Sequence, residues 1–387
     1  MEEYLNQNVK DIEISGIRKF FNLVQGKKDI VSLTIGQPDF KTPNHIKEAT
    51  KQSLDQNFTT YTPNAGIPEL RKSVSDYVSE QYQLQYKPDE EVIITVGASQ
   101  AIDITLRTII EPGDEVLLPG PVYPGYEPLI KLAGGKPVYV DTREHNFKFT
   151  SDLIEKHLTS KTKCVILPYP SNPTGVSLTK DELRDIAQLL KDQPVFILAD
   201  EIYHELTFEK PHVSIGAFDE VRKQTLIVQG VSKSHSMTGF RIGFLMGDSN
   251  VMKHVLKVHQ YNVSCATSTS QYAALEAMNN GLEDPKTMRE AYLKRRDYIV
   301  NRLEHMGVDV VKPDGAFYVF PKLTPPGQSS FDFGITLVDH AGLALVPGDA
   351  FSSYGQGYMR ISYAYHEEVL KEGLDRLEEF LLSQQTR

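Results

Sequence analysis

The sequence predicts an α/β fold, with a large domain built on a mostly parallel β-sheet covered by helices and a smaller α+β domain after it. Between about residues 91 and 247, short apolar runs alternate with longer amphipathic segments, which is the pattern of a strand–helix repeat. Most of the short runs are continuous aliphatic or β-branched stretches, as expected for strands buried on both faces. A second series of strand-like and helical segments follows residue 285.

The first series forms the large domain. Its helical patterns include Ser99–Ile110 and Thr179–Lys191, and the second opens with Thr179 and Glu182 at the spacing of a capping box. The expected strands are Val92–Val96, Glu115–Pro119, Pro137–Val140, Cys164–Leu167, Val195–Ala199, Leu226–Gln229 and Gly243–Met246.

The second series forms the small domain and begins with a long helical pattern at Lys286–Met306. We expect residues 1–44 to be an N-terminal segment that packs with the small domain, 45–284 to be the large domain and 285–387 the small domain. Further strands are expected at Val308–Val311, Ala316–Pro321, Leu343–Val346 and Tyr358–Tyr363, and further helices at Phe331–His340 and Glu367–Ser383.

Composition argues against several classes of protein. The 387 residues carry a net charge of −10 without a run of five Lys or Arg, so we expect no nucleic-acid or membrane partner. No apolar stretch reaches the roughly 18 residues of a membrane span, and the charged first thirty residues do not suit a signal peptide. Two cysteines, Cys164 and Cys265, are too few for a disulfide scaffold or a zinc cluster. We therefore expect no metal and a cytoplasmic location.

The segment from Gly230 to Gly243 (GVSKSHSMTGFRIG) carries the strongest chemical signal. It resembles the lysine signature of class-I aminotransferases, which are fold-type-I enzymes that use pyridoxal 5'-phosphate. The chemistry explains the residue types. Lys233 would form a Schiff base with the cofactor aldehyde and move the substrate α-proton. Arg241, eight residues further on, would hold the cofactor phosphate with two parallel hydrogen bonds.

The resemblance assigns roles in two neighbouring motifs. Asp200, in Ala-Asp-Glu-Ile-Tyr after an expected strand, would pair with the pyridine nitrogen and keep the ring cationic. Glu201 is the competing acid beside it. Tyr203 would donate a hydrogen bond to the phenolic oxygen of the cofactor. Asn172, in Pro-Ser-Asn-Pro-Thr-Gly, would reach the same oxygen and the substrate carboxylate.

The phosphate is expected where a strand turns into a helix, since helix N-termini bind anions. Ala98, Ser99 and Gln100 form this predicted cup, and Ser99 also suits a helix N-cap. Many members of the family carry a phosphate-binding Ser three residues before the lysine. Gly230 stands there in this chain, so that contact is lost or shifts to Ser232.

Other motifs concern the ring, the substrate and the partner subunit. Tyr123 would stack on the pyridine ring. Arg360 lies in an otherwise apolar strand and needs a partner, either the substrate α-carboxylate, as the resemblance implies, or a buried salt bridge. Gly36 lies in a loop that resembles the family loop whose backbone N–H reaches the same carboxylate. Tyr61 resembles the family Tyr that contacts the phosphate in the neighbouring subunit, which implies a homodimer.

These motifs lie in the family's order over about residues 30–365. They most resemble those of bacterial N-acetyl-LL-diaminopimelate, aspartate and aromatic aminotransferases. The expected function is a ping-pong transfer of an amino group from an amino acid to 2-oxoglutarate. The first candidate donor is N-acetyl-LL-diaminopimelate, in lysine biosynthesis. The donor pocket is expected to be built from Ile14–Arg18, the loop near Gly36 and residues of the partner subunit, and Arg18 could pair with a distal carboxylate.

Alternatives stay open beside this reading. The donor could be aspartate or an aromatic amino acid, and a C–S lyase would share the same cofactor motifs. A regulator that senses pyridoxal phosphate would need a DNA-binding domain, which the acidic chain, with only about thirty residues before Gly36, is not expected to hold. A Rossmann dehydrogenase does not fit, because no Gly-x-Gly-x-x-Gly follows an expected strand.

Overall fold

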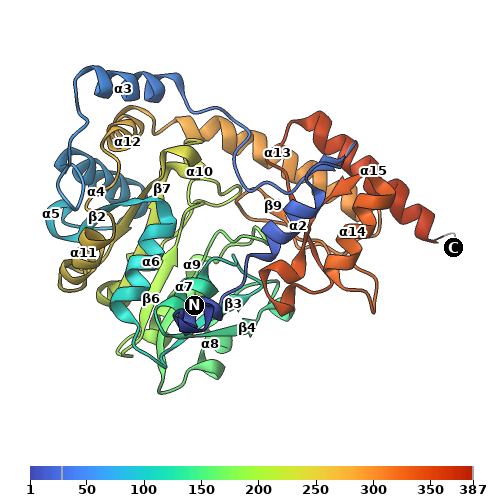
Figure 1. Cartoon of the computed structure of the whole chain (residues 1–387), viewed down its shortest axis with the longest axis horizontal. Coiled ribbons are helices and arrows are strands. Elements are labelled where there is room, and N and C mark those ends of the chain that lie inside the picture. Colours follow the sequence, from blue (N-terminus) through green and yellow to red (C-terminus); the bar gives the residue numbers. More distant parts are fainter. Residues whose placement is uncertain (28, 386–387) are drawn as a thin grey trace.

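The larger part of the molecule is organised around one β-sheet (Figure 1). In the computed structural model, which describes residues 1–27 and 29–385, this sheet has seven strands: β2 (Val92–Val96), β3 (Glu115–Gly120), β4 (Lys136–Asp141), β5 (Thr162–Leu167), β6 (Phe196–Asp200), β7 (Thr225–Gly230) and β8 (Ile242–Met246). Their order is β2-β8-β7-β6-β5-β3-β4. Strand β8 is antiparallel to β2 and β7, and the other neighbours are parallel. The predicted mostly parallel sheet is thus confirmed.

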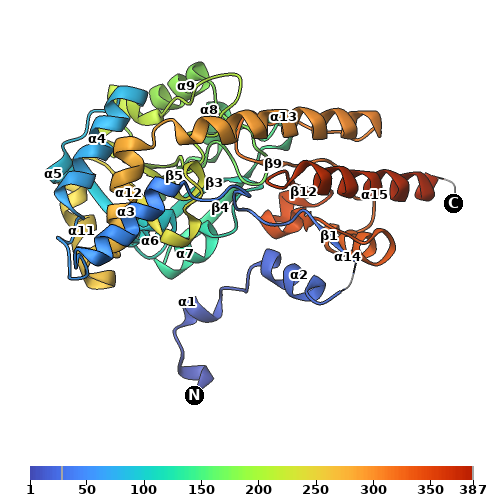
Figure 2. The same ribbon diagram turned by 90° about the horizontal axis from the view of Figure 1, so that it is seen from above.

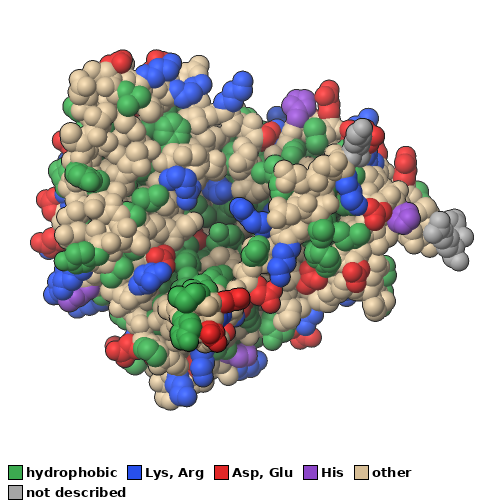
Figure 3. Space-filling model, in the orientation of Figure 1, with side chains coloured by type: hydrophobic (Ala, Val, Ile, Leu, Met, Phe, Trp, Pro, Cys, Tyr) green, Lys and Arg blue, Asp and Glu red, His purple; other side chains and the backbone are tan. Residues whose placement is uncertain are grey.

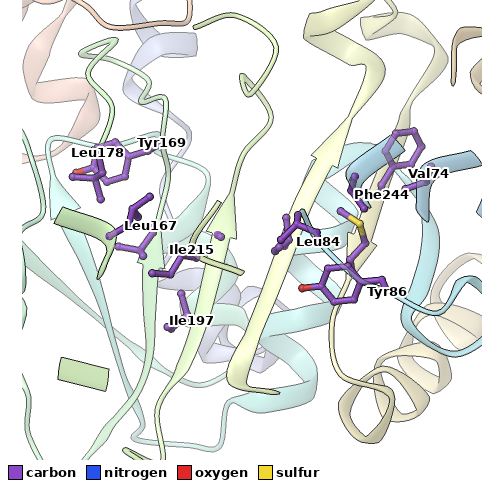
Figure 4. Packing of buried hydrophobic residues seen from close by; sticks show 14 of the residues in the cluster. Val74, Leu84, Tyr86, Leu167, Tyr169, Leu178, Ile197, Ile215 and Phe244 are labelled. Carbon is purple, nitrogen blue, oxygen red and sulfur yellow. The ribbon is translucent and has the colours of Figure 1, made fainter. Parts of the chain in front are cut away.

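Helices cover both faces of this sheet, because neighbouring residues of each strand point into different cores. On one face Ile197 of β6 joins a core with α4, α8, α9 and α12, and on the other face Leu198 joins a core with α6, α7 and α11. Figure 4 shows part of the first core, in which Leu167 and Ile215 lie near Ile197. The helices of this part are α3 (Asn44–Asp55), α4 (Pro68–Tyr82), α5 (Pro88–Glu91), α6 (Gly97–Ile109), α7 (Tyr126–Leu132), α8 (Ser151–His157), α9 (Lys180–Leu190), α10 (Val231–Ser234), α11 (Ser249–Val263) and α12 (Ser268–Asn280).

The smaller part holds the C-terminal elements: α13 (Asp284–His305), β9 (Tyr318–Val319), α14 (Ser330–Ala341), β10 (Leu343–Ala344), β11 (Val346–Pro347), β12 (Met359–Ser362) and α15 (Glu367–Gln385). Strands β11, β12 and β9 form an antiparallel sheet. Figure 2 shows α13 and α15 running side by side along this part. Their apolar side chains share one core with those of β9, β10 and β12.

The N-terminal residues reach both parts, since the first helix lies beside α7 of the large part and the second helix and first strand lie against the smaller part. They form α1 (Gln7–Lys10), α2 (Gly16–Val24) and β1 (Val31–Ser32), and α1 and α2 stand away from the large sheet (Figure 2). Strand β1 pairs in parallel with β10. Phe20 of α2 packs with Val338 and Ala344. These contacts place α2 beside the gap between the two parts, while the domain boundaries given above stay a prediction.

Several local expectations are confirmed and others are wrong. The capping box of α9 is present, with Thr179 Oγ1 accepting from the backbone N–H of Glu182 and Glu182 Oε2 accepting from that of Thr179. Helix α6 begins at Gly97 rather than Ser99, so Ser99 is not its N-cap. The expected single strand at Leu343–Val346 divides into β10 and β11, which pair in different sheets.

The expected strand at Val308–Val311 is absent from the described residues, and the expected strand at Ala316–Pro321 shrinks to β9. The side chains of Val308 and Val310 pack on the smaller core. Val308 N–H closes the end of α13 on Leu303 O. The alternating apolar residues of this segment therefore pack on the core although the segment is irregular and pairs with no strand in the part of the chain that the structure describes. Among residues 1–27 and 29–385, no helix combines the length and the apolar character of a membrane span.

Candidate active site

A cavity of about 860 Å³ opens between the large sheet, the smaller part and α2. Figure 3 shows the hollow near the middle of the molecular face, with Lys and Arg side chains around it. It lies beyond the carboxyl ends of β3, β5, β6 and β7, where α/β sheets bind ligands. The predicted site residues that line it are Gly36, Ala98, Ser99, Tyr123, Asn172, Asp200, Tyr203, Ser232, Lys233, Arg241 and Arg360.

The charge of this cavity is strongly unbalanced. Among the described lining residues, Asp200 is the only carboxylate, whereas Arg18, Lys233, Arg241 and Arg360 are all cations. Of these cations Arg360 is buried, Lys233 is partly buried, and Arg18 and Arg241 are exposed, and a hollow lined by an excess of one charge attracts ligands of the opposite charge. The cavity is therefore suited to a ligand that carries several negative charges.

Lys233 lies on α10, the short helix that directly follows β7. Its Nζ donates to the backbone oxygen of Gly36 at 2.7 Å. Burial, and then the cations Arg360 and Arg241, lower the pKa of Lys233 to about 8, while Asp200 acts in the opposite direction. At pH 7 the amine is therefore mostly protonated, but about a tenth of it is neutral and can act as a nucleophile or a base.

Asp200 ends β6 and faces the cavity, and it is only 7% exposed. Its Oδ2 accepts from the Tyr126 hydroxyl at 2.6 Å, and Oδ1 accepts from the backbone N–H of Ile202 at 3.2 Å. Burial raises the pKa of Asp200, against the effect of these hydrogen bonds. The carboxylate is held in a fixed orientation, and a cation beside it would stabilise its charge.

Glu201 does not compete for this position, because its side chain is bound elsewhere. Its Oε2 accepts from Gln229 Nε2 at 2.9 Å and lies 3.1 Å from His212 Nε2. Burial opposes its charge, but His212, Ser214 and Gln229 outweigh burial and lower its pKa. Of the two neighbouring acids, the structure thus presents only Asp200 to the cavity.

Arg360 on β12 is buried, and its neighbours are neutral groups. Its Nη1 donates to Asn172 Oδ1 at 2.9 Å and its Nη2 to Thr34 O at 2.6 Å. The guanidinium lies over the rings of Tyr318 and Phe351, at 4.5 and 5.1 Å from their centroids. Its Nε has no hydrogen-bond partner, and burial lowers the pKa of Arg360. The alternative of a buried salt bridge is wrong, because no ion pair involving Arg360 occurs among the described residues.

Tyr203 is paired with Tyr318, a tyrosine outside the predicted set of site residues. The two hydroxyls lie 2.8 Å apart. Burial, and then Tyr318, hold the pKa of Tyr203 well above its usual value, so the hydroxyl stays protonated and can donate. A Cβ at Gly36 would come 2.5 Å from the Tyr318 hydroxyl, so glycine there lets the loop approach the site.

The start of α6 forms an anion-binding corner with Arg241. Gly97, the first residue of α6, has φ +72°, and a Cβ there would collide with the Arg241 guanidinium, 2.9 Å from Cζ. Arg241 Nη1 also donates to Thr238 O at 3.0 Å. Ala98 and Ser99 line the cavity beside this guanidinium. Free backbone N–H groups, the positive end of the helix dipole and a cation therefore converge on one corner.

Two predicted residues do not line the cavity. The Gln100 side chain turns back, since Oε1 accepts from Val96 N–H at 2.7 Å and Nε2 donates to Asn262 Oδ1 at 2.9 Å. It braces the turn before α6, and this side chain does not reach the cup. Tyr61 lies on the surface and is 88% exposed. Its predicted contact across a dimer stays a prediction.

Tyr123 and Gly230 also have clear surroundings. The Tyr123 ring meets Tyr126 edge-on, with centroids 5.5 Å apart, at the wall of the cavity. A Cβ at Gly230 would lie 2.8 Å from Ile242 O and 3.0 Å from Gly243 Cα. A serine at this position would therefore force β7 and β8 apart, whereas Ser232 lines the cavity in its place.

Sequence reasoning did not select Tyr126, Tyr318 or Thr34. Tyr126 lies within the same Gly-Pro-Val-Tyr-Pro-Gly-Tyr segment as Tyr123, so that motif could have found it. Tyr318 and Thr34 lie outside the motifs, in apolar surroundings, and only the fold brings them to Arg360.

Comparison with known proteins agrees with this geometry. A family model described as "Aminotransferase class I and II" matches residues 28–377. A probable N-acetyl-LL-diaminopimelate aminotransferase from Bacillus subtilis is 59% identical over 382 residues, which are 99% of this chain and 97% of the relative. An aspartate aminotransferase from Pyrococcus abyssi is 40% identical over 371 residues, 95% of each chain.

A solved structure of an aromatic aminotransferase from Pyrococcus horikoshii superimposes with a TM-score of 0.90 at 38% identity, covering 95% of this chain and 99% of that one. The predicted fold of the aminotransferases is thereby confirmed. With a family model that spans most of the chain and relatives at this level of identity, the chain belongs to the class I and II aminotransferases, and its activity is the transfer of an amino group.

Proposed function

We propose that this aminotransferase uses pyridoxal 5'-phosphate and works as a homodimer with a ping-pong mechanism, with 2-oxoglutarate as amino acceptor. The single observation that carries this proposal is the cavity itself. In it Lys233, whose pKa is lowered to about 8, lies among arginines and shares the lining with one carboxylate, Asp200. Pyridoxal phosphate offers a phosphate, an aldehyde and a basic ring nitrogen, and each has a matching group in this cavity.

The residues present fit this cofactor. The α6 corner with Arg241 suits the phosphate, and Ser99 and Ser232 add hydroxyl groups there. Asp200 suits a cationic ring nitrogen, which would supply the countercharge that its buried carboxylate lacks. Tyr203 can donate to the phenolic oxygen. When bound, the cofactor would act as the electron sink for a carbanion at the substrate Cα.

Lys233 would serve both as the covalent attachment point and as the base. Because its pKa lies near 8, a neutral amine is available to take the proton from the substrate Cα and to return one at the other end of the transfer. The hydrogen bond to Gly36 O holds this amine beside the loop that precedes α3.

Arg360 would bind the α-carboxylate of every substrate. Its unpartnered Nε and its missing counterion leave it able to accept an anionic ligand. Asn172, already bound to its Nη1, would border the same carboxylate. A charge-assisted pair in this buried place is strong, because little water competes with it.

We propose N-acetyl-LL-diaminopimelate, in lysine biosynthesis, as the donor, with aspartate or aromatic amino acids as alternatives. The relative at 59% identity carries the first name, and relatives near 40% carry the others. Support also comes from the far wall of the cavity, which α2 builds from polar and apolar groups. Arg18 could meet a distal carboxylate there. The α2 side of the cavity is lined by Ile17, Arg18, Phe20, Phe21, Asn22 and Gln25.

Two measurements test the proposal. Borohydride reduction of the enzyme as isolated, followed by peptide mapping, should mark Lys233, and a label on another lysine would refute the assignment. A panel of donors with 2-oxoglutarate should then give the highest kcat/KM for N-acetyl-LL-diaminopimelate. If alanine or branched-chain amino acids win by about tenfold, the pocket does not select a distal charge. Release of a thiol without transamination would favour the lyase.

A further inference from the structure

His235 lies two residues after Lys233 and plays no part in the proposed chemistry. It is 4% exposed. Its Nε2 lies 2.9 Å from the backbone oxygen of Gly281, and its Nδ1 lies 2.8 Å from Ser234 Oγ. A carbonyl only accepts, so Nε2 carries the hydrogen. In the neutral ring Nδ1 then accepts from the Ser234 hydroxyl, which also lies 3.4 Å from Gly230 O. Burial lowers the pKa of His235, which agrees with this neutral form.

Gly281 is the point at which α12 gives way to α13. Its carbonyl accepts from Asp284 N–H at 3.0 Å as well as from His235. A Cβ at this glycine would meet Asp284 Oδ2 at 2.7 Å and Ala277 O at 2.8 Å. The helix junction at residues 281–283 is thus tightly closed, and it links the large sheet's helices to the smaller part.

A second histidine braces the same junction. His45 of α3 lies between Glu276 of α12 and Asp284 of α13, with both of its ring nitrogens 2.8 Å from a carboxylate oxygen. One imidazole therefore bridges the two helices directly. His45 thus restrains α12 relative to α13, and His235 contacts the same junction through Gly281 O.

The segment after Lys233 has other anchors nearby. Thr42 Oγ1 donates to Ser236 O at 2.7 Å, and Ser236 Oγ lies 3.1 Å from the sulfur of Met288 on α13. Ser236 has φ +53°, a strained conformation that its surroundings must hold in place. Figure 1 shows α10 beneath the region where α12 meets α13. The turn that carries the lysine is thus tied to the first helix of the smaller part.

We propose that His235 is a positioning residue, which ties the turn carrying Lys233 to the α12–α13 junction through the Gly281 carbonyl. The position of the Lys233 amine then follows the arrangement of these two helices. The proposal rests on the proposed function, because that function gives Lys233 its role. Misplacing a reacting group by about 1 Å can cost a hundredfold in rate, so this bond has a measurable effect.

Two amide variants separate the two hydrogen bonds of His235. The terminal nitrogen of glutamine is as many bonds from Cα as Nε2 of histidine, so His235→Gln can still donate to Gly281 O. The amide of asparagine reaches only as far as Nδ1, so His235→Asn keeps the contact with Ser234 and loses Gly281. We expect kcat to fall about tenfold or more in His235→Asn with KM changed less than about twofold, and His235→Gln to stay within about twofold of the wild type.

Two readouts do not depend on turnover. In the cofactor-free protein, the rate at which an amine reagent labels Lys233 should rise with pH and level off above about 8 in the wild type, because the neutral amine reacts. The pH at which the labelling rate levels off should change in His235→Asn and should stay the same in His235→Gln. Hydrogen exchange at residues 277–288 should accelerate only in His235→Asn.

The outcomes separate this proposal from the proposed function. If borohydride marks Lys233 in the wild type but His235→Asn keeps the wild-type kcat, labelling profile and exchange, the positioning role is wrong and the proposed function stands. Equal losses in both variants also refute it, because the Gly281 bond would then not be the cause. If borohydride marks another lysine, the proposed function itself fails. If His235→Asn does not fold, wild-type behaviour of His235→Gln supports the role and failure of both refutes it.

Discussion

Gly97→Ala tests the anion-binding corner at the start of α6. Glycine at this position has φ +72° and lies directly against the Arg241 guanidinium. An alanine methyl group would come 2.9 Å from Arg241 Cζ, closer than van der Waals contact allows. The Arg241 side chain must then move away, while the other side chains that line the cavity are not altered by the substitution.

The size of the effect follows from two contributions. A non-glycine residue in the left-handed region costs about 1–2 kcal/mol of folding stability. Losing one charge-assisted hydrogen bond to the cofactor phosphate costs about 1.5–3 kcal/mol of binding. At about 1.4 kcal/mol per factor of ten, the Kd for pyridoxal phosphate should rise about tenfold to a hundredfold.

Gly113→Ala is the matched control, because Gly113 has φ +95° and an alanine methyl group there would meet nothing within 4 Å. Both variants should lose similar stability in urea unfolding. Only Gly97→Ala should lose affinity when the cofactor-free protein is titrated with pyridoxal phosphate and followed by absorbance. Equal affinities for the two variants would show that Arg241 does not hold the phosphate, and the reasoning would be refuted.

Three other predictions concern the same cavity. Asp200→Asn should fold normally but lose more than about a hundredfold in kcat, because the ring nitrogen loses its countercharge; near-normal turnover would mean that another acid acts. Arg360→Ala should lower kcat/KM for all donors alike, by a factor that corresponds to about 2–5 kcal/mol of lost binding energy. A loss confined to one donor would contradict a role at the α-carboxylate. Mixing inactive Tyr61→Ala and Lys233→Ala subunits should restore part of the activity, since one site of the mixed dimer is intact. No recovery after confirmed subunit exchange would place both residues in one chain's site.

The strands of the large sheet can be predicted from the sequence because burial on both faces leaves continuous apolar runs. β7 and β8 are buried at every residue, and the apolar pattern predicts both within one or two residues of their ends. It gives a weaker signal for α12, because this helix contributes small alanines to the core, such as Ala273 and Ala277, which give little periodic signal.

The site is predictable where a local motif carries the chemistry and not where distant segments meet. Lys233 follows β7 and Asp200 ends β6, so the sequence places both at one edge of the sheet. Tyr318 reaches Arg360 because β9 pairs with β12 within the smaller part, and it reaches Tyr203 only after the smaller part packs against the large one. For Gln100 the motif predicts the position of the residue correctly but not the direction of its side chain, which binds Asn262.

The neighbouring acids at the end of β6 have a consequence for how this sheet must assemble. β6 is apolar towards both cores, so hydrophobicity alone distinguishes poorly between two registers that differ by one residue. A one-residue slip against β7, where Asp200 now pairs with Val228, would turn Glu201 into the cavity and bring Asp200 towards His212. The buried partners of Glu201 therefore do more than satisfy one carboxylate. They make the slipped sheet costly, and in this way they select which acid the active site receives.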